Sequence, residues 1–247
     1  VTGGADNNAR VWTPAAVRVF AGHQGPVLSV AVHPNGAQVV TGSADKTAKV
    51  WDVNNGNVVF DLAGHGDAVK AVAFARDGSK IVTGSTDKIV RAWNPGNGQV
   101  AATYPALPAP VLSLDVAPDH KTLAVGLADN SARVYDLSQA DPAKAEIQSI
   151  GGLGGPVNAV AILPDGATLL TASDDKTVKR WALVPPGAIK TFSGHAGQIY
   201  AAGWSPDGAK AVTGAADKSF RIWDVAQAKQ ERAVEKAHEN VVYAVAY

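Results

Sequence analysis

Short apolar runs of strand length recur along the chain, and polar turn signals bound each of them. Segments such as "HPNG" and "SPDG" follow these runs, and then come a second short apolar strand, a tight turn and a third strand. No window of 11–18 residues has a sustained 3.6-residue apolar period, so the pattern predicts an all-β protein with almost no helix. The apolar runs are "PVLSVAV" (26–32), "AVKAVAF" (68–74), "PVLSLDV" (110–116), "PVNAVAI" (156–162) and "QIYAAGW" (198–204).

A cassette of small, acidic, basic and aromatic residues returns six times. "GSADKTAKVWD" at 42–52 is followed by "GSTDKIVRAWN" at 84–94, and the aspartates of successive copies are separated by 39, 42, 42, 46 and 42 residues. A four-stranded sheet cannot bury both of its faces alone, so a repeat of this length predicts stacked sheets that cover one another. In every copy an aromatic residue stands six positions after the aspartate: Asp6 and Trp12, Asp45 and Trp51, Asp87 and Trp93, Asp129 and Tyr135, Asp175 and Trp181, Asp217 and Trp223.

Gly-His pairs stand at the other end of three of these units, at 22–23, 64–65 and 194–195. With Gly-His at one end and Trp-Asp at the other, the chain resembles the WD-repeat family over essentially its whole length. The resemblance implies one β-propeller domain over 1–247, made of four-stranded antiparallel blades, six in number and closed by the N- and C-terminal strands. The alternative is a fragment of a seven- or eight-bladed propeller. The expected blades are centred on Trp12 with Tyr243, Trp51, Trp93, Tyr135, Trp181 and Trp223.

The resemblance also implies a role for the repeated polar residues. In this family the turn aspartate bonds the histidine, the histidine reaches a hydroxyl on the second strand, and the hydroxyl meets the tryptophan of the third. Because the set recurs while a catalyst needs one site, we expect a stabilising network rather than a catalytic triad. The expected sets are His23, Thr41, Asp45, Trp51; His65, Thr83, Asp87, Trp93; Thr171, Asp175, Trp181, without a histidine; His195, Thr213, Asp217, Trp223; and His238, Thr2, Asp6, Trp12 across the chain ends.

Composition excludes several classes of function. Lys plus Arg and Asp plus Glu are 22 each, so no charge excess predicts a nucleic-acid partner. Cysteine is absent, which excludes disulfides and thiolate chemistry and leaves the compartment open between cytoplasmic and bacterial extracytoplasmic. No apolar run approaches the ~18 residues of a membrane span. His33 and His120 have no regularly spaced ligand partners, and no phosphate loop or nucleophile elbow occurs, so we expect no metal, no cofactor and no enzyme.

These observations favour a non-catalytic scaffold that binds a protein or peptide, as a monomeric domain or as part of a larger assembly. Two alternatives are an accessory or targeting domain of a larger enzyme, and a propeller enzyme or small-ligand binder that uses the channel mouth. In the resembled family, partners contact positions near the histidine and before the aspartate. The expected contact residues here are Leu28, Lys70, Thr86, Leu112, Asn158, Asp174, Gln198, Tyr200 and Tyr243.

Overall fold

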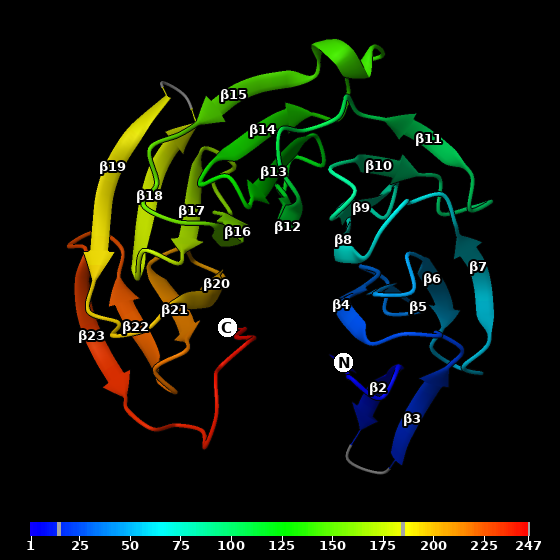
Figure 1. Cartoon of the computed structure of the whole chain (residues 1–247), viewed down its shortest axis with the longest axis horizontal. Coiled ribbons are helices and arrows are strands. Elements are labelled where there is room, and N and C mark those ends of the chain that lie inside the picture. The colour runs from blue at the N-terminus through cyan, green and yellow to red at the C-terminus, as the bar shows by residue number, and fades with distance from the viewer. Residues whose placement is uncertain (14–15, 184–185, 247) are drawn as a thin grey trace. The chain divides into compact units, whose positions relative to one another are not determined.

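The computed structural model describes residues 1–13, 16–183 and 186–246, and the regular structure in them is almost entirely β-strand (Figure 1). The one helical element among these residues is a 3-10 turn, η1 (Pro142–Lys144), so the all-β prediction is confirmed. The chain divides into two compact units. The first comprises Val1–Val116 with Ser138–Lys144, and the second comprises Ala117–Leu137 with Ala145–Tyr247.

The first unit contains one three-stranded and two four-stranded antiparallel sheets, followed by one further strand. Each four-stranded sheet begins at one of the apolar runs identified in the sequence. The strands are β1 (Thr2–Gly3), β2 (Asn8–Thr13) and β3 (Ala16–Ala21); β4 (Val27–Val32), β5 (Gln38–Ser43), β6 (Ala48–Asp52) and β7 (Val58–Leu62); β8 (Val69–Phe74), β9 (Ile81–Ser85), β10 (Val90–Trp93) and β11 (Val100–Thr103); and β12 (Val111–Val116).

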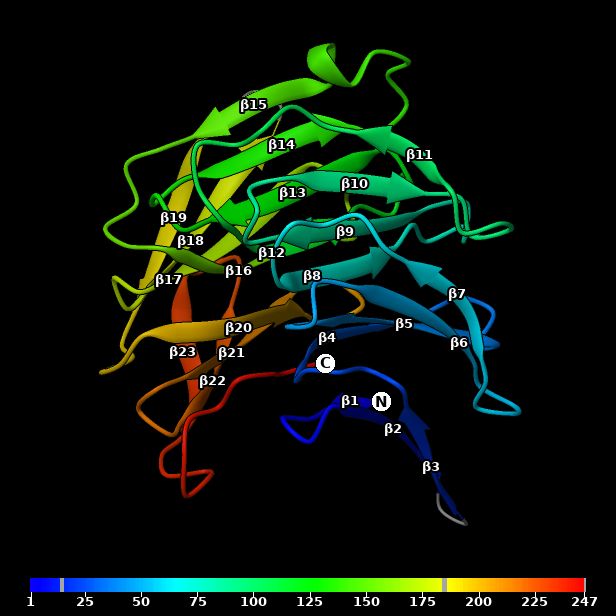
Figure 2. The ribbon, with the colours of Figure 1, turned by 45° about the vertical axis from the view of Figure 1, so that its right-hand side comes forward.

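The second unit repeats the same arrangement. Its strands β13 (Thr122–Leu127), β14 (Ala132–Asp136) and β15 (Glu146–Ile150) pair antiparallel in chain order, and two four-stranded sheets follow (Figure 2). Their strands are β16 (Val157–Ile162), β17 (Thr168–Ser173), β18 (Thr177–Leu183) and β19 (Pro186–Ser193), then β20 (Ile199–Trp204), β21 (Lys210–Ala215), β22 (Phe220–Asp224) and β23 (Lys229–Val234).

The turn between the second and third strands has the same backbone in every repeat. The residue after the turn aspartate is left-handed, for example at Lys46 (φ 72°), Lys176 (φ 68°) and Asn130 (φ 66°). Asparagine tolerates this conformation better than lysine does, since its short side chain bonds the local backbone. The turn carries the aspartate to the start of the third strand, so its carboxylate can reach the loop before the first strand.

Consecutive sheets within a unit approach closely at small residues. A Cβ on Gly42 of β5 would lie 2.8 Å from the Val69 carbonyl oxygen of the next sheet, and one on Gly84 of β9 would lie 2.4 Å from a Val111 methyl. Burial follows these contacts: Val40, Leu62, Val69 and Trp93 belong to one core cluster. The first strand of the next repeat therefore covers each of these two sheets, as the repeat predicts.

The C-terminal segment packs in the same manner without forming a strand. The Val242 amide donates to the Ala215 carbonyl at 3.1 Å, and a Cβ on Gly214 would lie 2.6 Å from a Val242 methyl. No strand is assigned in 241–246, so the expected strand there is not formed, and the sheet β1-β2-β3 has three strands among the described residues. Closure of a six-bladed ring and a single domain over 1–247 stay predictions.

Candidate functional site

Three of the predicted polar sets come together with nearly identical geometry. His195 Nδ1 lies 2.9 Å from Asp217 Oδ2, and its Nε2 lies 2.8 Å from Thr213 Oγ1. Trp223 Nε1 donates to the same Thr213 oxygen at 2.8 Å. The sets His23, Thr41, Asp45, Trp51 and His65, Thr83, Asp87, Trp93 have the same bonds at 2.7–2.9 Å.

The protonation of these chains follows from their donors and acceptors. An ionised carboxylate can only accept, so His195 Nδ1–H donates to Asp217, and the bare Nε2 accepts the Thr213 hydroxyl proton. Burial lowers the pKa of His195 and outweighs the attraction of Asp217, which keeps the imidazole neutral. Burial raises the pKa of Asp45, but hydrogen bonds from Thr47, the Gln24 amide and His23 outweigh it and lower the value to about 2.

In each of these three sets the turn aspartate also accepts a hydrogen bond from the loop that carries the histidine. The Ala196 amide donates to Asp217 Oδ2 at 2.8 Å. In the repeat of Asp175, which has no histidine, the Gly154 amide still donates to Asp175 Oδ2 at 2.9 Å, and Lys179 Nζ donates to the same oxygen at 3.4 Å. Each complete His–Asp–Thr–Trp network therefore joins two loops and two strands, and its polar atoms bond one another. That arrangement supports a structural role.

The remaining predicted sets are incomplete. Trp181 Nε1 donates to Thr171 Oγ1 at 2.9 Å, and Trp12 Nε1 donates to Thr2 Oγ1 at 2.9 Å. Trp12 is 58% exposed, unlike the buried Trp51. His238 is exposed, and its backbone amide donates to the Lys218 carbonyl at 3.4 Å. Its membership of a set with residues of the other unit stays a prediction.

Sequence reasoning missed a serine that supports the turn. Ser43 Oγ donates to the Gly25 carbonyl at 2.9 Å and accepts the Asp45 amide at 3.1 Å. Ser85 and Ser173 make the equivalent bonds. The signal was present in the sequence, because a serine stands two positions before the aspartate in three repeats.

A second kind of site lies in the second unit, where the repeat pattern is broken. Asp174 stands where the other repeats have alanine or threonine, and Gln198 stands where they have proline, alanine or valine. Asn158 likewise replaces leucine, lysine or tyrosine. Residues at these positions take no part in the His–Asp–Thr–Trp networks, so these networks do not restrict which side chain stands there. The structure brings all three together.

Hydrogen bonds connect this cluster. Asn158 Nδ2 donates to Asp174 Oδ1 at 2.5 Å and to the Ile199 carbonyl at 3.0 Å, which joins β16 to β20. Gln198 Nε2 donates to Asp174 Oδ2 at 3.0 Å, and the Tyr200 hydroxyl donates to Gln198 Oε1 at 2.7 Å.

An aromatic pair forms one edge of the cluster. The rings of Tyr200 and Tyr243 have centroids 5.3 Å apart at an interplanar angle of 46°, and Tyr243 is 69% exposed. The pKa of Tyr200 is raised by burial and by the negative charge of Asp174. We call the five residues Asn158, Asp174, Gln198, Tyr200 and Tyr243 the Asp-Tyr cluster.

The predicted contact residues of the first unit form no such cluster. Leu28 is 38% exposed and Lys70 is exposed, whereas Leu112 is half-buried. Thr86 is half-buried, and its hydroxyl donates to the Ala68 carbonyl at 3.4 Å.

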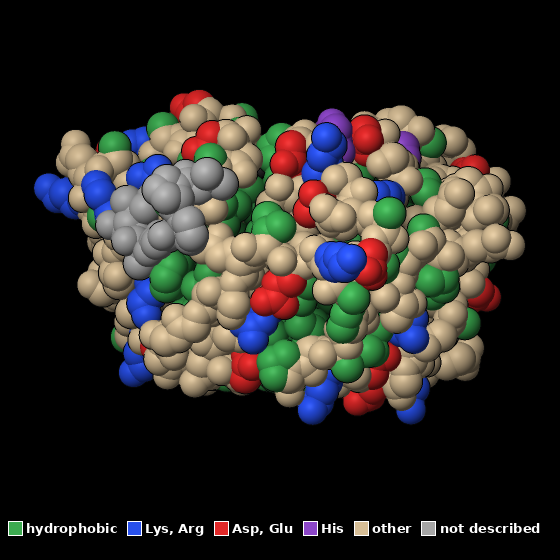
Figure 3. Space-filling model, turned by 90° about the horizontal axis from the view of Figure 1, so that it is seen from above, with side chains coloured by type: hydrophobic (Ala, Val, Ile, Leu, Met, Phe, Trp, Pro, Cys, Tyr) green, Lys and Arg blue, Asp and Glu red, His purple; other side chains and the backbone are tan. Residues whose placement is uncertain are grey.

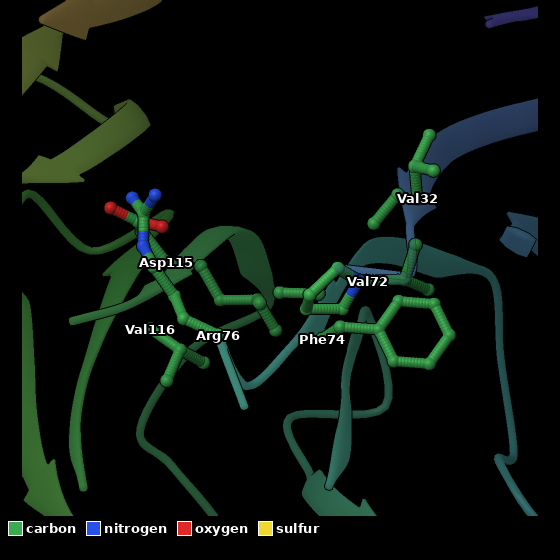
Figure 4. Close-up of a pocket in the computed structure, with 10 residues that line it drawn as sticks. Val32, Val72, Phe74, Arg76, Asp115 and Val116 are labelled. Atoms are coloured by element: carbon green, nitrogen blue, oxygen red, sulfur yellow. The ribbon is translucent and has the colours of Figure 1, made fainter. Parts of the chain in front are cut away.

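In the first unit, the ends of β4, β8 and β12 that lie away from the Gly-His loops form a hollow of about 460 Å³ (Figure 4). Val32, Val72, Phe74 and Val116 line it, and at its rim the side chains of Arg76 and Asp115 point toward one another. Both charged residues depart from the repeat. The positions equivalent to Arg76 carry proline, and those equivalent to Asp115 carry alanine or glycine.

Basic and acidic side chains are intermixed on the face of the molecule seen in Figure 3. Among the described residues, no three His, Cys, Asp or Glu side chains are grouped to hold a metal ion. The described part of the chain also has no helix with the length and apolar character that a membrane crossing requires.

Comparison with known proteins agrees with this geometry. The WD40 family model (WD domain, G-beta repeat) matches residues 15–52, 56–94, 98–136, 146–182 and 187–224.

Among similar curated proteins, the nuclear distribution protein PAC1 of Scheffersomyces stipitis is 48% identical over 52 residues, 21% of this chain and 9% of that protein. The guanine nucleotide-binding protein subunit beta of Arabidopsis thaliana is 38% identical over 61 residues, 23% of this chain and 16% of that protein. The pre-mRNA-splicing factor PRP46 of Yarrowia lipolytica is 54% identical over 41 residues, 17% of this chain and 9% of that protein. The matched segments thus span a small part of each relative.

Proposed function

Because the chain belongs to the WD-repeat family, we propose that it is a non-catalytic scaffold that captures a protein or peptide on the face of its Gly-His and Asp turns. Members of this family are generally interaction scaffolds. The observation that carries the proposal is the Asp-Tyr cluster, in which the repeat-breaking residues Asn158, Asp174 and Gln198 form one hydrogen-bonded, partly exposed group with Tyr200 and Tyr243. Tyrosine is enriched among residues that dominate binding energy.

The difference between the residues that form the hydrogen-bond networks and the variable residues beside them supports this proposal. The His–Asp–Thr–Trp chains hold the loops in place, which leaves the neighbouring positions free to vary. Leu28, Lys70, Thr86 and Leu112 are proposed contact positions in the first unit on the same reasoning. An accessory or targeting role within a larger enzyme is the alternative, and it uses the same surface.

Selection of peptides from a random phage-displayed library against the whole chain tests the proposal. Peptides selected on the unmodified protein should lose binding to the double variant Tyr200→Ala with Tyr243→Ala. They should keep binding to Val32→Ser, which alters the hollow at the opposite strand ends. Circular dichroism and urea midpoints check that both variants are folded. Loss of binding only in Val32→Ser would place the partner site elsewhere and refute the proposal.

A further inference from the structure

The Asp-Tyr cluster contains one carboxylate, that of Asp174, whose hydrogen-bond partners in the described structure are uncharged. Both oxygens of Asp174 accept bonds from uncharged amides, those of Asn158 and Gln198. Among the described residues no lysine or arginine forms an ion pair with Asp174, whereas the next residue, Asp175, pairs with Lys179. A carboxylate has about four acceptor positions, so Asp174 keeps acceptor capacity for an incoming donor.

The aromatic pair stands next to this charge. The Tyr200 hydroxyl is fixed by Gln198, which also bonds Asp174, so ring and carboxylate are held by one amide side chain. The ring of Tyr243 lies 5.3 Å from that of Tyr200 at 46° and is largely exposed. Two tilted ring faces beside a carboxylate form a surface that attracts a cation through both the quadrupoles and the charge.

We propose that the Asp-Tyr cluster binds an arginine side chain of the partner, with the guanidinium on the tyrosine rings and its N–H groups directed at Asp174. Arginine fits better than lysine, because its planar guanidinium is weakly hydrated, stacks on aromatic faces and donates in a fork that matches a carboxylate. This inference rests on the proposed function and names the partner's chemistry.

A lysine near Asp174 provides a control variant for the arginine-binding experiment. Lys176 lies two residues beyond Asp174 in the same turn and is exposed. Its ammonium opposes a bound cation, so Lys176→Gln should leave arginine binding intact or strengthen it.

Binding of N-acetyl-arginine amide to the whole chain tests the proposal directly. With ¹³C-labelled tyrosine, ring signals of Tyr200 and Tyr243 should shift saturably at millimolar concentrations. N-acetyl-citrulline amide, which has the same shape without the charge, should shift them at least about fivefold less per mole, as expected for loss of a cation–π contact and an ion pair. Asp174→Asn should weaken arginine binding by about two- to fivefold. Tyr243→Ala should weaken it by a similar factor.

Several results would overturn the inference. Equal shifts with citrulline would show that charge is not recognised, and unchanged affinity in Asp174→Asn would show that the carboxylate takes no part. The absence of saturable shifts would exclude the site altogether. If selected peptides depend on both tyrosines but arginine amide does not bind, the interaction face stands and the arginine inference fails. If arginine amide binds but peptide capture ignores the tyrosines, the proposed function fails instead.

Discussion

The threonine of the polar network offers a test within a single chain, because its repeats contain different versions of the same site. Thr213 is fully buried, and its hydroxyl satisfies both His195 Nε2 and Trp223 Nε1. Replacing it by valine keeps the shape and removes both bonds. Thr171 makes only the bond to Trp181, which is half-buried. The third repeat already has Val125 at this position.

The magnitudes follow from the number of atoms left unpaired. Each buried polar atom without a partner costs about 1–3 kcal/mol, and Thr213→Val leaves two such atoms, so it should lower the free energy of unfolding by about 2–6 kcal/mol. Thr171→Val should cost only about 1 kcal/mol, since it leaves a single indole N–H without its partner, on a half-buried tryptophan. Thr213→Ser keeps the hydroxyl and should cost about 1 kcal/mol for the lost buried methyl.

Equilibrium urea unfolding followed by tryptophan fluorescence and by far-UV circular dichroism measures these differences. Coincident transitions from the two probes are needed before free energies are compared. Equal losses in Thr213→Val and Thr171→Val, or a smaller loss in Thr213→Val than in Thr213→Ser, would refute the reasoning. Either result would mean that the histidine contributes nothing through the threonine.

Three further predictions concern titration, turn geometry and sheet packing. The lowered pKa of His195 means that the unfolded chain binds protons more readily than the folded one. The urea concentration at the unfolding midpoint should therefore decrease as the pH is lowered from about 7.5 to about 5.5, and a constant midpoint contradicts this. Lys176→Asn should raise stability by about 0.5–1 kcal/mol, since asparagine tolerates the left-handed turn, and a lower melting temperature would argue against it. Gly42→Ala should cost about 1–3 kcal/mol because its Cβ meets Val69 of the next sheet, whereas Gly151→Ala, with open space around it, should not; calorimetry distinguishes them.

Much of the fold could be predicted from spacing alone. The five apolar runs became β4, β8, β12, β16 and β20, each within one residue of the predicted start. In three of the predicted polar sets all four residues are connected by hydrogen bonds, since a repeat presents the same residues at the same offsets. The same spacing predicted a strand within 241–246, and the structure has none there. An apolar sequence alone does not form a strand, because a strand also requires a hydrogen-bonding partner.

The candidate site shows where the sequence reaches its limit. The sequence could place Asp174 in the turn before the third strand, and Gln198 and Tyr200 at the start of the first strand, because the repeat assigns every position a location. It could not reveal the hydrogen bonds between their side chains. The Gln198–Asp174 bond connects residues 24 positions apart, and both this bond and the Tyr200–Gln198 bond depend on side-chain rotamers that local packing determines. The sequence by itself determined the repeating sheets, because burial of apolar faces depends on pattern. Only the tertiary structure decided which polar side chains meet, because hydrogen bonds depend on distance and direction.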